Sequence, residues 1–98
     1  MSDSASGKAG AADRQRLLIN VNGVVQGVGF RPFVYRLATA TQLVGFVSNN
    51  STGVVIEIEG PSDVLAKFRR DLIEQLPPLA RIDDCQVQEI LPAGDTGF

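Results

Sequence analysis

Histidine and tryptophan are absent from this chain of 98 residues, and cysteine occurs once, as Cys85. Without histidine, the chain cannot assemble the Ser-His-Asp triad or the Cys-His pair that many hydrolases use. Zinc favours nitrogen and sulfur ligands, so a zinc site built from the remaining carboxylates is not expected. A lone cysteine also excludes an internal disulfide, which is compatible with a reducing cytoplasm. Any hydrolytic chemistry would have to proceed without a histidine base, and we expect neither a metal nor a cofactor.

Long apolar runs are also missing. None approaches the ~20 residues of a transmembrane helix, so we expect no membrane partner. The first 16 residues are rich in Ser, Ala and Gly and lack the apolar segment of a secretion signal. We predict that residues 1–15 form a disordered tail and that residues 16–98 form one cytoplasmic domain. The net charge of −2 argues against nucleic acid as the main partner, because a phosphate backbone demands a basic face.

The apolar pattern predicts four strands and two helices. Alternating apolar residues indicate half-buried strands, whereas apolar residues three and four apart indicate helices with one buried stripe. The expected order is a strand over residues 17–22, a helix over 32–41, strands over 43–48 and 54–59, a helix from 60–63 to the Pro77-Pro78 pair, and a strand over 82–91. Two such helices must cover one face of a single antiparallel sheet. The βαββαβ order therefore predicts an α+β fold, the ferredoxin-like sandwich.

Side-chain alternation also places the charged residues and the thiol. Cys85, Val87 and Leu91 should face the core, where a cysteine acts as a small apolar residue. Glu57 and Glu59 should lie on the outer, wet face of their strand, which has no aromatic platform for nucleic acid. The arginines outside the glycine-rich segment should be solvated or belong to the tail and its junction, namely Arg14, Arg16, Arg36, Arg69, Arg70 and Arg81.

The junction between the first strand and the first helix, Gly-Val-Val-Gln-Gly-Val-Gly-Phe-Arg-Pro at residues 23–32, is the strongest functional signal. Pro32 suits the first helical position and favours an extended backbone at Arg31, which places this arginine near the N-cap. Backbone N–H groups, the helix dipole and a guanidinium together favour an oxyanion, and phosphate fits because a guanidinium binds it bidentately. The alternative is an ordinary glycine-rich turn that binds nothing. The segment is neither a P-loop, which needs a lysine, nor a dinucleotide-binding fingerprint.

Two separated motifs in this order resemble the acylphosphatase family. The first is residues 23–31, and the second is Gly-Phe-Val-Ser-Asn-Asn-Ser-Thr-Gly at residues 45–53. A third element is Glu59-Gly60-Pro61, which leads into a helix. The runs at 31–38 and 77–83 are more similar to the acylphosphatase-like domain at the N-terminus of hydrogenase maturation carbamoyltransferases.

The resemblance extends from about Leu17 to Leu91 and agrees with the ferredoxin-like fold. It implies that the chain is part of a longer protein with zinc-binding and ATP-using domains further along, and it implies a hydrogenase maturation partner. It also implies a final short strand. Because residues 92–98 read as a loop, we expect that strand to be truncated and one sheet edge to be left open.

The resemblance further implies that Arg31 binds phosphate and that Asn49 positions the attacking water during hydrolysis of acyl phosphates or carbamoyl phosphate. A carboxamide has no useful pKa near neutrality, but it can hold a water by accepting and donating hydrogen bonds. The leaving carboxylate or carbamate is a weak base, so positioning and charge stabilisation suffice without a general acid or a metal. The phosphoryl group, and inorganic phosphate as product, would be bound by the Arg31 guanidinium and the backbone amides of Gln26, Gly27, Val28, Gly29 and Phe30.

Two alternatives stay open at this point. The domain could bind carbamoyl phosphate, or dock neighbouring domains of a longer protein, without turnover. Asn49 could also serve the turn alone, where asparagine is abundant, and Asn50 could take its place by composition.

Overall fold

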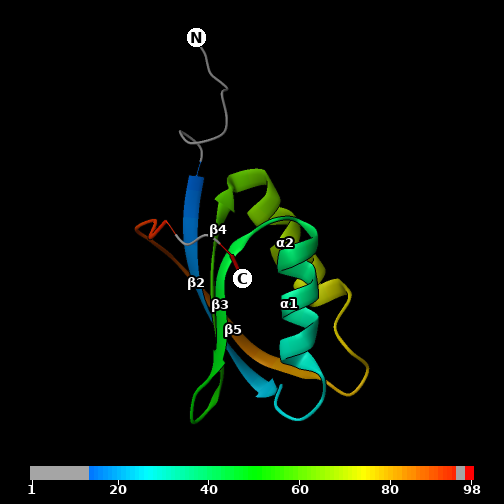
Figure 1. Cartoon of the computed structure of the whole chain (residues 1–98). Coiled ribbons are helices and arrows are strands. Elements are labelled where there is room, and N and C mark those ends of the chain that lie inside the picture. Colours follow the sequence, from blue (N-terminus) through cyan, green and yellow to red (C-terminus); the bar gives the residue numbers. More distant parts are fainter. Residues whose placement is uncertain (1–13, 95–96) are drawn as a thin grey trace.

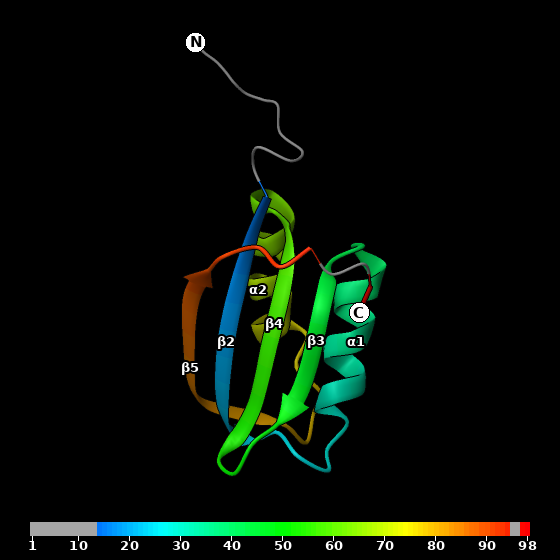
Figure 2. The same cartoon turned by 60° about the vertical axis from the view of Figure 1, so that its left-hand side comes forward.

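The computed structural model describes residues 14–94 and 97–98, and the elements follow the expected order. The strands are β2 (Arg14–Val24), β3 (Val44–Asn49), β4 (Gly53–Pro61) and β5 (Arg81–Ile90), and the helices are α1 (Phe30–Ala40) and α2 (Ser62–Glu74). The strands form one sheet in the order β3-β4-β2-β5, and every neighbouring pair is antiparallel. Both helices lie on one face of this sheet (Figure 1, Figure 2). The predicted ferredoxin-like sandwich is confirmed.

The core lies between the sheet and the two helices. Alternate residues of the two central strands face the helices, and the register pairs Leu17 with Ile58, Ile19 with Ile56, and Val21 with Val54. These side chains are at most 7% exposed, and burying each one contributes about 1.5–3 kcal/mol relative to leaving it in water. The helices close the core with Phe30, Phe33, Val34 and Ala38 from α1 and Leu65, Phe68 and Leu72 from α2. Neither helix is long and apolar enough to cross a membrane, and no other described segment is helical.

The first strand begins earlier than the sequence predicts. β2 starts at Arg14, so Arg14 and Gln15 belong to a strand and not to the expected tail; residues 1–13 lie outside the described part of the chain. Arg16, expected at a solvated junction, is only 2% exposed. The physical reason lies on the helix-free face of the sheet, where both arginines meet carboxylates of β4.

Glu59 is the centre of this charge cluster. Its Oε2 accepts a hydrogen bond from Arg14 Nε at 2.7 Å, and its Oε1 accepts one from Arg16 Nη1 at 3.1 Å. Arg16 Nε also donates to Glu57 Oε1 at 2.9 Å. Glu59 is 1% exposed, which corrects the expectation that it lies on a wet face. Burial by itself would raise the pKa of Glu59, but hydrogen bonds from both arginines and from two backbone N–H groups after β5 lower it from 4.5 to about 2.

Residues 91–94, which follow β5, pass in front of β2 and β4 near one end of these strands (Figure 2). The backbone N–H groups of residues 93 and 94 donate to Glu59 Oε1 at 2.7 and 3.3 Å. Gly97 then accepts a hydrogen bond from Gly45 N of β3 at 2.9 Å, and the Phe98 ring meets the Tyr35 ring with centroids 6.1 Å apart. Within the described residues no strand follows β5. The sequence predicts that one edge of the sheet is open; in the structure, the β3 edge is contacted at Gly45 by the hydrogen bond to Gly97.

The last strand is less buried than expected. Cys85 and Val87 do face the helix side, since they pair with Val21 and Ile19, but Cys85 is exposed and Val87 is 36% exposed. Leu91 lies beyond the strand and is 87% exposed. The expectation of core positions is wrong because β5 is an edge strand, and a side chain on the inner face of an edge is buried only where a helix covers it.

Candidate active site

The loop between β2 and α1 forms a short cradle of backbone. Val25 and Phe30 anchor its two ends, each only 1% exposed. Between them, Gly27 and Gly29 adopt positive φ angles of 73° and 82°, which glycine accepts without the strain that a side chain would add. Gly29 is the N-cap, so α1 begins two residues earlier than predicted: Arg31 is its second residue and Pro32 its third. Proline is tolerated there because the first-turn N–H groups have no partner within the helix.

The cradle presents unsatisfied donors. Among the described residues, no protein group accepts a hydrogen bond from the backbone N–H groups of residues 26–29. The first N–H groups of α1 lie next to them and also lack intrahelical acceptors. The first turn of α1 contains no acidic residue. The N-terminal end of a helix dipole is positive, so the cradle is a concentrated positive site that an anion would satisfy.

Arg31 adds a formal charge at this point. Its side chain is exposed, and it makes no ion pair with any residue in the described part of the chain. By contrast, Arg14, Arg16 and Arg81 all bind carboxylates. A guanidinium beside the positive end of a helix is unfavourable unless an anion binds both. The arrangement at Arg31 is therefore suited to an oxyanion such as phosphate.

The hairpin between β3 and β4 distinguishes the two asparagines that composition leaves equivalent. Asn50 is used by the turn, since its Oδ1 accepts hydrogen bonds from Gly53 N at 2.7 Å and from Thr52 N at 2.9 Å. Asn49 ends β3 and pairs with Val54, a core residue. Because directly paired residues point to the same face of a sheet, the Asn49 side chain lies on the helix side. It is exposed and makes no hydrogen bond to another described side chain or backbone group.

The cradle and the hairpin are adjacent at one end of the sheet (Figure 1, Figure 2). The contact is made by the Gln26 side chain, whose Nε2 donates to Gly53 O at 3.0 Å and to Asn50 O at 3.2 Å. The sequence indicated Gln26 only for its backbone amide. Its side-chain hydrogen bonds reach residues that follow it by 24 positions (Asn50) and by 27 positions (Gly53) in the sequence. No local sequence pattern could have predicted these contacts.

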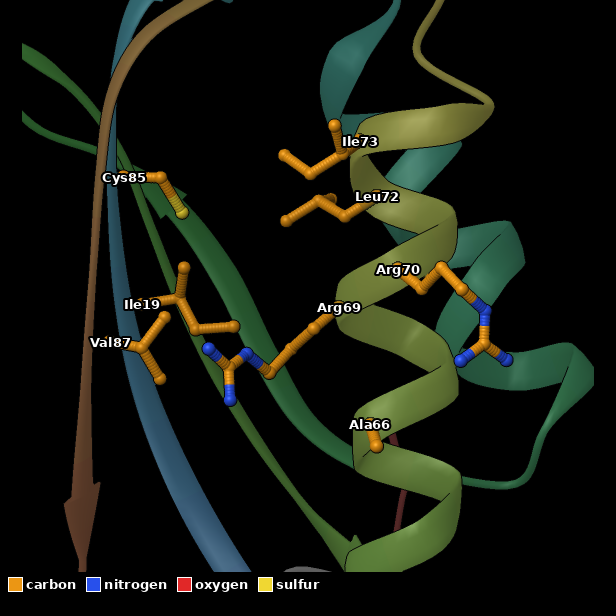
Figure 3. Close-up of a pocket in the computed structure, with 8 residues that line it drawn as sticks. All are labelled: Ile19, Ala66, Arg69, Arg70, Leu72, Ile73, Cys85 and Val87. Atoms are coloured by element: carbon orange, nitrogen blue, oxygen red, sulfur yellow. The ribbon is translucent and has the colours of Figure 1, made fainter.

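A separate pocket of about 400 Å³ lies between α2 and β5. Figure 3 shows the Arg69 side chain and the Cys85 sulfur directed into it, whereas Arg70 points away. Burial raises the pKa of the Cys85 thiol; Arg69 opposes this effect and Asp84 adds to it. The remaining lining is apolar, with Ile19, Ala66, Leu72, Ile73 and Val87. None of the residues that line this pocket belongs to the cradle or to the hairpin of residues 49–53, so it is a separate feature.

Metal ligands do not gather in the described part of the chain: no group of three or more His, Cys, Asp or Glu side chains there could hold an ion. The donors available at the cradle are backbone N–H groups, a guanidinium and carboxamides. Such donors bind and orient an oxyanion and a water, but none of them is suited to act as a proton acceptor near neutral pH.

Comparison with known proteins places these features in context. The Acylphosphatase family model matches residues 17–98. The carbamoyltransferase HypF of Rhizobium leguminosarum bv. viciae is 55% identical over 84 residues, which cover 86% of this chain and 11% of that protein. An acylphosphatase of Caldivirga maquilingensis is 41% identical over 86 residues, covering 85% of this chain and 90% of that protein. A crystal structure of full-length HypF in its phosphate- and nucleotide-bound form matches with a TM-score of 0.87 at 40% identity, over 95% of this chain and 12% of that chain. The chain thus spans about a tenth of the carbamoyltransferases that it matches.

Proposed function

Because this chain belongs to the acylphosphatase family, we propose that it hydrolyses acyl phosphates, with carbamoyl phosphate among them, to the free acid and inorganic phosphate. The observation that carries the proposal is the cradle itself. Its backbone N–H groups have no acceptor among the described residues, and they lie beside the start of a helix whose first turn has no acid. Arg31 follows, and it forms no ion pair with the part of the chain that the structure describes. A phosphoryl group satisfies all of these groups at once.

In the proposed mechanism, the cradle amides of residues 26–30 and the Arg31 guanidinium hold the non-bridging phosphoryl oxygens. They stabilise the charge that these oxygens carry in the transition state. Asn49 holds a water by its carboxamide and orients it toward phosphorus. The carboxylate or carbamate leaves as a weak base, so no residue has to protonate it. Binding, orientation and charge stabilisation therefore account for the reaction without a histidine or a metal.

A second candidate function is binding without turnover, within a longer hydrogenase maturation carbamoyltransferase. The identity to HypF and the small share of HypF that the chain covers favour a domain that works together with others. The cradle and Arg31 serve binding as well as hydrolysis. Only Asn49 is specific to hydrolysis, so this residue separates the two functions.

The test measures hydrolysis of an acyl phosphate and of carbamoyl phosphate, together with inorganic phosphate affinity from product inhibition. We expect Arg31→Gln to lower kcat/KM by about 100- to 1000-fold, the typical loss on removing one such donor, and to weaken phosphate binding as well. Asn49→Ala should lower kcat by about 100-fold while phosphate affinity changes by less than about threefold, because a water-positioning group acts mainly in the transition state.

Arg36→Gln is the matched control, because Arg36 is an exposed arginine of the same helix and should leave both quantities unchanged. Phosphate binding without turnover in the unaltered chain would favour the binding module. Full activity in a folded Arg31→Gln variant would remove the cradle from the mechanism.

A further inference from the structure

We propose that the Gln26 carboxamide is a positioning residue for hydrolysis: it fixes the hairpin of residues 49–53 against the phosphate cradle, so that Asn49 and its water face the bound phosphoryl group. The proposal rests on the proposed function and deepens it. The site has two halves, the phosphate cradle and the hairpin of residues 49–53, and the proposal makes one side chain responsible for aligning them.

Gln26 belongs to both halves. Its backbone N–H is one of the cradle donors that have no protein acceptor among the described residues. Its side chain uses both hydrogens of the amide nitrogen on the hairpin, with Nε2 3.0 Å from Gly53 O and 3.2 Å from Asn50 O. A primary amide has two donor hydrogens, so neither is left for a ligand. The side chain is therefore directed at the hairpin and the backbone at the anion.

The two carbonyls that Gln26 binds close the hairpin loop. Asn50 N donates to Gly53 O at 2.9 Å, so Gly53 O accepts both the closing bond of the loop and the bond from Gln26. Asn49 directly precedes the other bound residue, Asn50. Fixing these carbonyls fixes the end of β3 from which the Asn49 side chain projects. In the described residues, these are the only hydrogen bonds between residues 25–30 and the hairpin.

The alignment would not be secure without this contact. β3 is an edge strand, and residues 48–52 are all exposed. A hairpin end with few buried contacts moves more easily than the core strands beside it. A displacement of about 1 Å at a reacting group can lower a rate by about 100-fold. Two hydrogen bonds at an exposed loop contribute little to global stability, so their main effect is on geometry.

The chemistry of the contact requires a neutral amide of this length. Glutamate has the same length but no donor hydrogens, and its charge would repel both carbonyls and the bound anion. Asparagine is one methylene shorter. Methionine keeps the length and adds neither charge nor donors, so Gln26→Met removes the contact with the least other change. Ser51→Ala is the matched control, because Ser51 lies in the same exposed loop and makes no side-chain hydrogen bond to the described residues.

The experiment compares kcat, KM and phosphate inhibition in the unaltered chain, Gln26→Met, Asn49→Ala, the double variant and Ser51→Ala. We expect Gln26→Met to lower kcat by about 10- to 100-fold with phosphate affinity within about threefold of the original. In the double variant, kcat should equal that of Asn49→Ala within about twofold, because a residue that acts through Asn49 has nothing to position once Asn49 is gone. Multiplying effects, or a phosphate affinity that falls as far as kcat does, would overturn the proposal.

Amide hydrogen exchange provides a readout that does not depend on activity. Gln26→Met should accelerate exchange at the amides of Asn50 and Gly53, and Ser51→Ala should not. Unchanged exchange in Gln26→Met would overturn the proposed contact even in a fully active protein. Absence of hydrolysis in the unaltered chain, with phosphate still bound, would instead refute the proposed function and the positioning role together, so the two failures are distinguishable.

Discussion

Replacing Glu59 by glutamine should lower the free energy of unfolding by about 3 kcal/mol at neutral pH and by much less in acid. Glu59 is buried on the helix-free face of the sheet, where it binds Arg14, Arg16 and the backbone N–H groups of residues 93 and 94. Glutamine keeps the shape but removes the charge. The buried Arg16 then loses one of its carboxylate partners, and with it much of the compensation for its own burial.

The magnitude follows from proton linkage. The pKa of Glu59 is about 2 in the folded chain against 4.5 for an unperturbed group, and each unit is worth about 1.4 kcal/mol. The difference corresponds to about 3 kcal/mol, in the range of about 3–5 kcal/mol measured when one partner of a buried pair is removed. Because the folded pKa is the lower one, this stability is fully present above pH 4.5 and is lost as the pH falls toward 2. Less than half of it should remain at pH 3.

The assay is urea unfolding followed by far-UV circular dichroism, from pH 7 to pH 3, for the unaltered chain and Glu59→Gln. The midpoints should differ by about 1–3 M urea at pH 7, given about 1–3 kcal/mol per M for a small domain, and should converge in acid. Glu89→Gln is the control, since Glu89 is exposed on β5 and a surface change of this kind is worth at most about 0.5 kcal/mol. A difference under about 1 kcal/mol at pH 7, or one that is constant down to pH 3, would refute the reasoning.

Three further outcomes are expected. Hydrolysis should persist in EDTA, since the described residues offer no metal-binding cluster; loss of activity that added divalent ions restore would contradict this. Cys85 should react with a thiol reagent in the folded chain because it is exposed. The labelled protein should still hydrolyse acyl phosphates, because Cys85 pairs with Val21 of β2, four residues before the cradle begins at Val25, or roughly 13 Å along the chain at about 3.3 Å per residue. Inhibition with the fold intact would contradict this. Gly29→Ala should destabilise the fold by about 1–2 kcal/mol, the cost of a side chain in the left-handed region, and should weaken phosphate binding through the displaced amides; unchanged affinity would show that the N-cap geometry is not part of the anion site.

The spacing of apolar residues predicted most of the fold, because the residues that show this spacing are the ones that form the core. The alternation at Val54, Ile56 and Ile58 and the stripe at Leu65, Phe68 and Leu72 are the buried positions of β4 and α2. The glycine-rich junction was located correctly, although the helix starts earlier than Pro32 suggested, since Gly29 in the left-handed region begins it. Local sequence rules predict these features because each of them is determined by residues that are only a few positions apart in the sequence.

The features that sequence reasoning missed all depend on residues far apart in the chain. Arg16 and Glu59 read as solvated charges, but each is buried by a partner 43 positions away. Cys85 was placed on the correct face, yet alternation does not say whether a helix covers that face at the edge of a sheet. Composition left Asn49 and Asn50 equivalent, and only the strand register and the turn hydrogen bonds separate their environments. The roles of Arg31 and Asn49 in hydrolysis stay predictions.

The candidate site also divides the chain into two parts with different freedom to change. Its groups all come from residues 26–53, and no side chain of α2 or β5 belongs to it. α2 covers the same face of the sheet as α1, and β5 forms the edge opposite β3. These two elements carry exposed apolar residues in Ile73 and Val87. Exposed positions of these two elements can therefore change, with the buried stripe kept intact, without altering any group of the candidate site. A protein engineer could redesign α2 and β5 as a unit separate from the segment that contains the candidate site.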